Sequence, residues 1–96
     1  MSGEGNDPLI RQLREEISGN DRELVAAVNA RLRLVAQLKR VKEERGLDFV
    51  DVAREEWMLQ YLGRANSGPL SAEGLREFYA ELLELTKREV TREDTS

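Results

Sequence analysis

The stretch that decides the fold is residues 8–45, PLIRQLREEISGNDRELVAAVNARLRLVAQLKRVKEER. After its first residue it has no proline, and its one glycine is Gly19. Asp7 followed by Pro8 predicts a helix start, because a short acidic side chain caps a helix and proline suits its first position. Gly46 predicts the end of the same helix. Apolar residues recur at the three- and four-residue spacing of a helix with one buried stripe, namely Ile10, Leu13, Ile17, Leu24, Ala27, Leu34, Leu38 and Val41.

A helix of this length is large for the chain that contains it. It would be about 55 Å long at 1.5 Å per residue, whereas a compact chain of 96 residues has a radius of gyration of about 12–13 Å. A chain this short also gains core by folding with a partner subunit. We therefore expect the helix to pack against a second chain.

Two shorter helices are predicted downstream. Asp51 can cap a helix that runs to about Arg64, with Val52, Trp57, Met58, Tyr61 and Leu62 as its apolar set. Residues 65–69 form a loop, after which Ser71 can cap a third helix with Leu75, Phe78, Tyr79, Leu82, Leu83 and Thr86 on one side. The predicted fold class is all-α, with one long and two shorter helices in each chain of an intertwined homodimer. The helical domain is expected over residues 7–90, between flexible tails at 1–6 and 91–96.

The composition excludes several classes of function. There is no cysteine and no histidine, which excludes disulfides and thiolate metal sites and removes the commonest general base. The net charge of −4 argues against nucleic-acid binding. No apolar run approaches the roughly 20 residues that span a membrane, and the N-terminus does not have the pattern of a signal peptide. We expect a cytoplasmic protein that uses no cofactor.

Charged residues interrupt the apolar stripe of the long helix. If Ile10 takes position a of a heptad, the same column contains Arg31, and Arg14 and Lys42 fall in an adjoining column. A cation on a buried seam is costly unless it is paired. Two interpretations stay open at this point: Arg31 pairs with a carboxylate of another helix and specifies the oligomeric state, or the cations bind an anionic ligand.

The spacing limits how the three cations can cooperate. Lys42 follows Arg31 by 11 residues, on nearly the same face and about 16 Å along the helix axis. Arg14 precedes Arg31 by 17 residues, about 25 Å away, so it cannot reach the same small ligand from the same chain. An antiparallel dimer would bring Arg14 of one chain toward Arg31 and Lys42 of the other, twice by symmetry.

A second polar cluster opens the second helix. Asp51 and Glu55 are favoured there by capping and by the helix dipole, but Arg54 is not. The group follows the link after Lys42 directly and could fold back over the cations. A carboxylate in that position could accept a hydrogen bond from a ligand hydroxyl.

Together these residues resemble the AroQ-type, all-helical chorismate mutases. The resemblance extends from about Leu9 to Val90. The segments that carry it are Leu13-Arg14-Glu15-Glu16-Ile17 with Asp21, Asn29-Ala30-Arg31-Leu32, Lys42, and Asp51-Val52-Ala53-Arg54-Glu55. It implies an intertwined homodimer with two shared active sites, and the rearrangement of chorismate to prephenate on the way to phenylalanine and tyrosine.

The resemblance also implies roles for single residues. Arg14 of the partner subunit and Arg31 would hold the two substrate carboxylates, and Lys42 would contact a carboxylate and the ether oxygen. Glu55, with the backbone of Asp51, would receive the ring hydroxyl.

Three further positions complete this implied site. Arg54 would support the corner that receives the ring hydroxyl, and Thr86 stands where the family has serine or threonine near a carboxylate. Val90 departs from the family, which offers glutamine or glutamate to the ether oxygen there. Either Glu89 or Arg88 takes over that role, or Lys42 acts alone, or the substrate differs.

Other functions remain compatible with the sequence. A same-fold enzyme could act on a related substrate, as 4-amino-4-deoxychorismate mutases and isochorismate-pyruvate lyases do. A non-catalytic helical dimer would use Arg31 and Lys42 in structural ion pairs. Feedback control would have to come from a partner, such as the first enzyme of the shikimate pathway.

Overall fold

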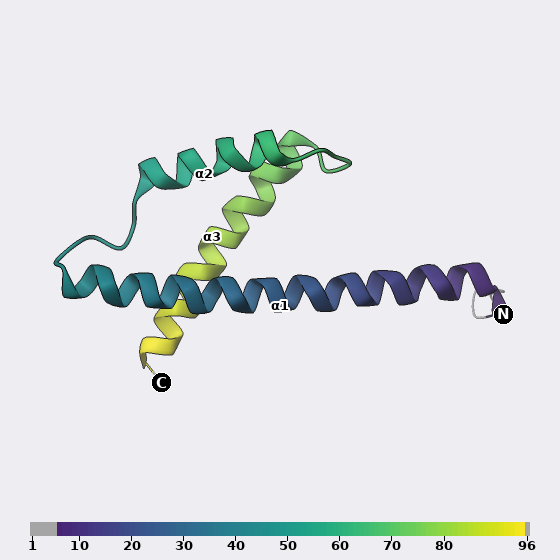
Figure 1. Cartoon of the computed structure of the whole chain (residues 1–96), viewed down its shortest axis with the longest axis horizontal. Helices are drawn as coiled ribbons and strands as arrows, with labels where there is room; N and C mark the ends of the chain where they lie inside the picture. The colour runs from purple at the N-terminus through teal and green to yellow at the C-terminus, as the bar shows by residue number, and fades with distance from the viewer. Residues whose placement is uncertain (1–5, 96) are drawn as a thin grey trace. The chain divides into compact units, whose positions relative to one another are not determined.

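The computed structural model describes residues 6–95, which form three helices (Figure 1). The bounds are α1, Pro8–Glu44; α2, Val52–Ala65; and α3, Ala72–Thr95. The described residues contain no strand, so the predicted all-α fold class is confirmed. Most of the expected N-terminal tail, residues 1–5, lies outside the described part of the chain.

Each helix begins at a short polar side chain that the sequence predicts as its cap. The caps are Asp7, Asp51 and Ser71, whose side-chain oxygens accept hydrogen bonds from backbone N–H groups of the first turn. These donors would otherwise have no partner within the helix. The donors and distances are Leu9 at 2.9 Å, Arg54 at 3.1 Å and Gly74 at 2.9 Å.

The C-terminus of α1 closes on Gly46. This residue has φ +68°, a left-handed conformation that glycine adopts without steric cost. The N–H of Leu47 donates to the carbonyl of Lys42 at 2.8 Å, and the N–H of Gly46 donates to Glu43 at 3.2 Å. This pair of bonds is the Schellman motif, which satisfies carbonyls at the helix end.

The chain divides into two compact units, Met1–Arg33 and Leu34–Ser96. The first contains most of α1, and the second contains the last turns of α1, the link, α2 and α3. In the second unit α2 and α3 pack against each other. The loop between these two helices is fixed by Asn66, which donates to the Leu70 carbonyl at 2.8 Å and accepts from the N–H of Gly68 at 3.0 Å.

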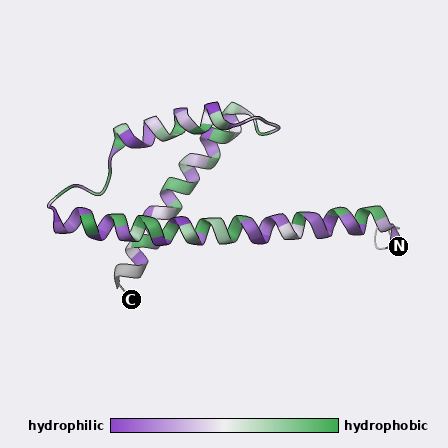
Figure 2. Ribbon diagram, viewed as in Figure 1, coloured by the Kyte–Doolittle hydropathy of each residue, from purple (hydrophilic) through white to green (hydrophobic). Residues whose placement is uncertain are grey.

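The apolar stripe of α1 is exposed within the single chain. Figure 2 shows hydrophobic and hydrophilic residues interspersed along the whole of α1. Leu9 is 61% exposed and Leu34 65% exposed. The other exposed members of the stripe are Leu13, Ile17, Leu24, Leu38 and Val41. Among residues 6–92, few are buried, namely Ala36, Tyr79, Thr86 and Val90.

The third helix, α3, continues to Thr95. The domain boundary at residue 90 stays a prediction. After Gly74 the chain has no glycine or proline to stop the helix. The hydroxyl of Thr91 also donates to the carbonyl of Lys87 at 2.8 Å, one turn earlier.

Because the cap at Gly46 requires a positive φ, Gly46→Ala should destabilise the protein by about 1 kcal/mol. An added Cβ would meet nothing within 4 Å, so the cost comes from the backbone alone. The measurement is urea unfolding at fixed protein concentration.

Gly63→Ala is the matched control. Gly63 lies in α2 with equally open surroundings, and alanine there should stabilise the protein by about 0.5–1 kcal/mol. Equal effects of the two substitutions would contradict the role given to Gly46.

Candidate active site

Six of the eight predicted site residues lie in the second unit. They come from all three helices: Lys42 from α1; Asp51, Arg54 and Glu55 from the start of α2; and Thr86 and Val90 from α3. The other two, Arg14 and Arg31, lie on the part of α1 that belongs to the first unit.

Lys42 is in the last turn of α1, where it is half-buried. Its ammonium group donates to the carbonyl of Phe49 at 3.1 Å, and its own carbonyl accepts from Leu47. The side chain and the backbone of one residue thus hold both ends of the link that leads to α2. This arrangement fixes the position of the cation at the entry to the second helix.

The first turn of α2 presents two carboxylates. The side chain of Asp51 is committed to the helix end, where it accepts from the N–H of Arg54 at 3.1 Å. Glu55 lies one turn further along and is half-buried. Since Asp51 already serves as the cap, Glu55 is the carboxylate of this turn that is not committed to the helix end.

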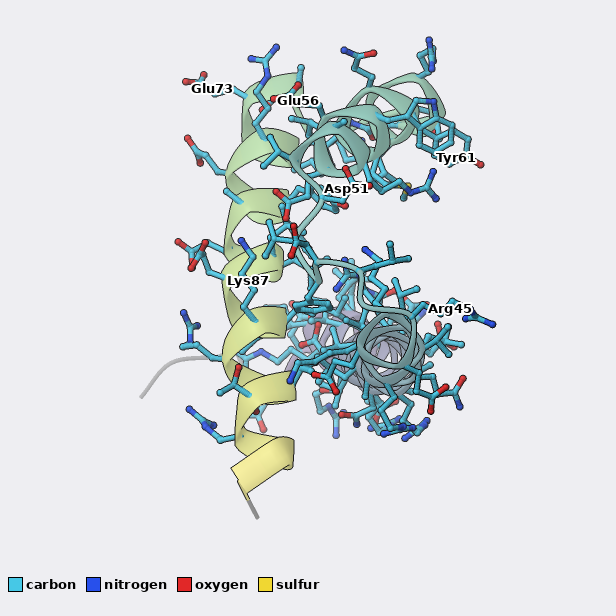
Figure 3. All side chains as sticks on the ribbon, turned by 90° about the vertical axis from the view of Figure 1, so that its left-hand side faces the viewer. Arg45, Asp51, Glu56, Tyr61, Glu73 and Lys87 are labelled. Atoms are coloured by element: carbon cyan, nitrogen blue, oxygen red, sulfur yellow. The ribbon has the colours of Figure 1, made fainter. Side chains whose placement is uncertain are left out.

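An ion pair joins this turn to α3. Lys87 Nζ lies 3.7 Å from Glu55 Oε1 and 3.8 Å from Glu84 Oε1, and Figure 3 labels Lys87 on α3 and Asp51 at the start of α2. Lys87 was not among the residues predicted from the sequence. The sequence feature that could have indicated Lys87 is its position, directly after Thr86 and three residues before Val90 on α3.

The two predicted residues of α3 are buried. Thr86 is 4% exposed, and its hydroxyl donates to the carbonyl of Leu82 at 2.6 Å. Val90 is 2% exposed and has no polar atom in its side chain. Val90, which the resemblance aligns with a polar side chain, is therefore an apolar core position in this chain.

Arg54 stacks on an aromatic pair. Its guanidinium carbon is 4.4 Å from the ring centroid of Trp57, and Trp57 stacks on Tyr61 with centroids 5.3 Å apart and planes 7° apart. The sequence placed both rings in the apolar set of this helix, but both are about half exposed. A cation over an indole face is held by the ring quadrupole, so Trp57 helps to fix the direction of Arg54.

The groove between α2 and α3 is a separate feature. It contains none of the predicted site residues. Its lining consists of Glu56, Leu59, Gln60, Gly63, Ala72, Leu75 and Arg76. Within residues 6–95, no cluster of three side chains suited to holding a metal ion is found.

The comparisons with known proteins identify the family. The sequence profile of the chorismate mutase type II family matches residues 13–90. The chain belongs to this family. The matched range includes all eight predicted site residues, and it confirms both the resemblance and the prediction of an enzyme, an isomerase that acts on chorismate.

Solved chorismate mutases have the same fold. Form I of the chorismate mutase from Thermus thermophilus is 36% identical, with a TM-score of 0.78 over 80% of this chain and 96% of that one. Form II of the same enzyme is 35% identical, with a TM-score of 0.82 over 86% of this chain and 94% of that one. The comparison with curated protein sequences gave no significant match. No helix in the described part of the chain is long and apolar enough to cross a bilayer.

The contact between Arg54 and Trp57 can be measured by a double-mutant cycle. Arg54→Met, Trp57→Leu and the double variant should show a coupling of about 0.5–1 kcal/mol in the free energy of unfolding, because the pair is exposed. The measurement is urea unfolding at one protein concentration.

Arg64, in the last turn of the same helix, provides the control. Arg64→Met and Trp57→Leu should be additive. If the Arg54→Met and Trp57→Leu substitutions were also additive, the stacking would contribute nothing to the free energy of unfolding.

Proposed function

We propose that the chain rearranges chorismate to prephenate, as a homodimer in which each active site takes residues from both subunits. The observation that carries this proposal is the family match over residues 13–90. Within that range the chain has every charged residue that the resemblance assigns to the site: Arg14, Arg31, Lys42, Asp51, Arg54 and Glu55. A cytoplasmic location and a regulatory partner enzyme stay predictions.

The reaction suits a site built from fixed charges. In the pericyclic shift one C–O bond breaks while one C–C bond forms, and the reaction needs no nucleophile and no proton transfer. A site can accelerate it by holding the flexible enolpyruvyl arm over the ring. A fixed cation can also stabilise the negative charge that grows on the ether oxygen.

The exposed stripe of α1 supports the homodimer. Large apolar residues from Leu9 to Val41 are about 40–65% exposed in one chain, and contiguous apolar surface of this kind marks an interaction site. A second copy would cover it with an identical stripe through a two-fold interface. The same interface would bring Arg14 of the partner subunit to a site that it cannot reach within its own chain.

Arginine and lysine would divide the recognition of the substrate. The guanidinium groups of Arg31 and of the partner's Arg14 would each bind one carboxylate, because the planar fork of arginine matches a carboxylate in two places. Lys42 would face the ether oxygen. Its existing bond to the Phe49 carbonyl supports this role, since the ammonium group is held in place before substrate arrives.

The opposite end of the substrate would meet the first turn of α2. Glu55 would accept the hydrogen bond of the ring hydroxyl, with the Asp51 backbone beside it. Asp51 is committed to the helix cap and Glu55 is held by Lys87, so this corner is ordered by contacts already present. Arg54 would support it from the outer side of the turn.

Removing the fixed cation tests the mechanism. Lys42→Ala should lower kcat/KM for chorismate by about 10²–10³, the loss expected for one preorganised contact at a developing oxyanion. The measurement is chorismate consumption with identification of prephenate, below the unfolding temperature of the variant.

Arg40→Ala is the matched control. Arg40 is an exposed cation two residues earlier and on the opposite side of α1. It should keep nearly full activity. A Lys42→Ala variant within threefold of the unmodified protein would remove Lys42 from the mechanism.

Mixed dimers test the sharing of the site. Arg14→Ala and Lys42→Ala subunits should each be inactive alone. When equal amounts are refolded together, half of the dimers combine the two variants and carry one intact site, so about a quarter of full activity should return.

Recovery of activity in this mixture requires that Arg14 acts across the interface. If Arg14 served its own chain, each site would lack one cation and the mixture would stay inactive. A mixture of two Lys42→Ala preparations treated in the same way gives the background.

A further inference from the structure

The ion pair between Lys87 and Glu55 differs from other ion pairs of the described chain. Lys39–Glu43 and Arg92–Glu89 each lie within one helix, whereas Lys87–Glu55 joins α3 to the first turn of α2. The side chains of Lys87 and Glu55 are 36% and 27% exposed. The pair is therefore only partly screened by solvent.

Glu55 is also the carboxylate that the proposed function places against the ring hydroxyl. A group hydrogen-bonded to the second oxygen of Glu55 is then separated from the Lys87 ammonium by one hydrogen-bond length, one carboxylate width and the 3.7 Å ion pair. The substituent on that ring carbon is thus exposed to the charge of Lys87 as well as to that of Glu55. This feature is independent of Arg31 and Lys42, which meet the other end of the substrate.

We propose that Lys87 is a specificity-determining residue, which makes this corner accept a neutral hydroxyl and reject a protonated amine. The proposal rests on the proposed function and extends it to the choice between chorismate and 4-amino-4-deoxychorismate, the analogue with an amino group in place of the ring hydroxyl. A lone carboxylate would attract an ammonium group. A carboxylate that is already paired with a lysine presents the ammonium group of the ligand with one opposite charge and one like charge.

This discrimination rests on what the two ligand groups need from Glu55: a hydroxyl needs a hydrogen-bond acceptor, whereas an ammonium group needs a negative charge. A hydroxyl needs only a lone pair of Glu55, which the Lys87 contact leaves available. An ammonium group needs uncompensated negative charge, because it loses its hydration on entering the site. Specificity of this kind arises from a repulsive element set against the wrong ligand.

Other charges near the pair do not reverse this argument. Glu84 shares Lys87 at 3.8 Å, but its side chain is 63% exposed, so solvent screens its effect. Asp51 accepts the N–H of Arg54, which places its carboxylate against the positive end of the helix dipole. The guanidinium of Arg54 lies over Trp57 and adds positive charge on the same turn.

The test is the ratio of kcat/KM for chorismate to kcat/KM for 4-amino-4-deoxychorismate, measured with the dimeric protein by loss of the diene ultraviolet absorbance. Lys87→Met keeps an unbranched, flexible side chain, one atom shorter, and removes its charge. It should lower the ratio about tenfold or more, the size expected for one half-buried like charge. Lys87→Arg keeps the charge and should hold the ratio within about threefold of the unmodified protein.

Arg92→Met is the matched control, since it removes a cation from the same helix whose side chain is 72% exposed. It should leave the ratio unchanged. If Lys87→Met proves too unstable to assay, Lys87→Gln takes its place, with the same expected fall in the ratio.

Two results would overturn the inference while the proposed function stands. One is an unchanged ratio in Lys87→Met. The other is an equal loss of kcat/KM for both substrates, which would show that Lys87 only orders Glu55. Failure of the unmodified protein to consume chorismate would instead overturn the proposed function itself, and the two failures are told apart by that single measurement.

Discussion

The apolar stripe of α1 is the constraint on which the rest of the structure depends. A helix of 37 residues carries large side chains from one end to the other, and a single chain leaves most of them about half exposed. Exposed apolar surface on this scale is stabilised by a partner. In the proposed dimer, the distance between Arg14 and Arg31 along the same helix has a functional meaning, because one active site would take its cations from two chains.

The sequence predicted the local features of the fold well. Asp7, Asp51 and Ser71 were found as caps because a cap depends on one side chain and the next three residues. Gly46 was found because few residues other than glycine adopt its backbone conformation. The end of α3 is harder to predict, because the chain after residue 90 has no glycine or proline to stop a helix.

The contacts that order the site were harder to predict. The contacts of Lys42 with the Phe49 carbonyl and of Lys87 with Glu55 join residues of different elements. Both contacts are made by long side chains that can point in several directions. No spacing rule selects one of those directions. Arg54 over Trp57 is different, because residues three apart on a helix are neighbours. The burial of Val90 also needed the structure, since a valine in an amphipathic helix fits either a core position or the rim of a site.

The aromatic stack on α2 has a practical consequence. Trp57 is the one tryptophan of the chain, and it lies between the Tyr61 ring and the guanidinium of Arg54. The indole therefore carries the whole tryptophan emission of the protein, and it lies two residues after Glu55 in the first half of α2. The fluorescence of Trp57 is therefore an intrinsic probe of this part of α2, and it is sensitive to the position of Arg54 without any added label.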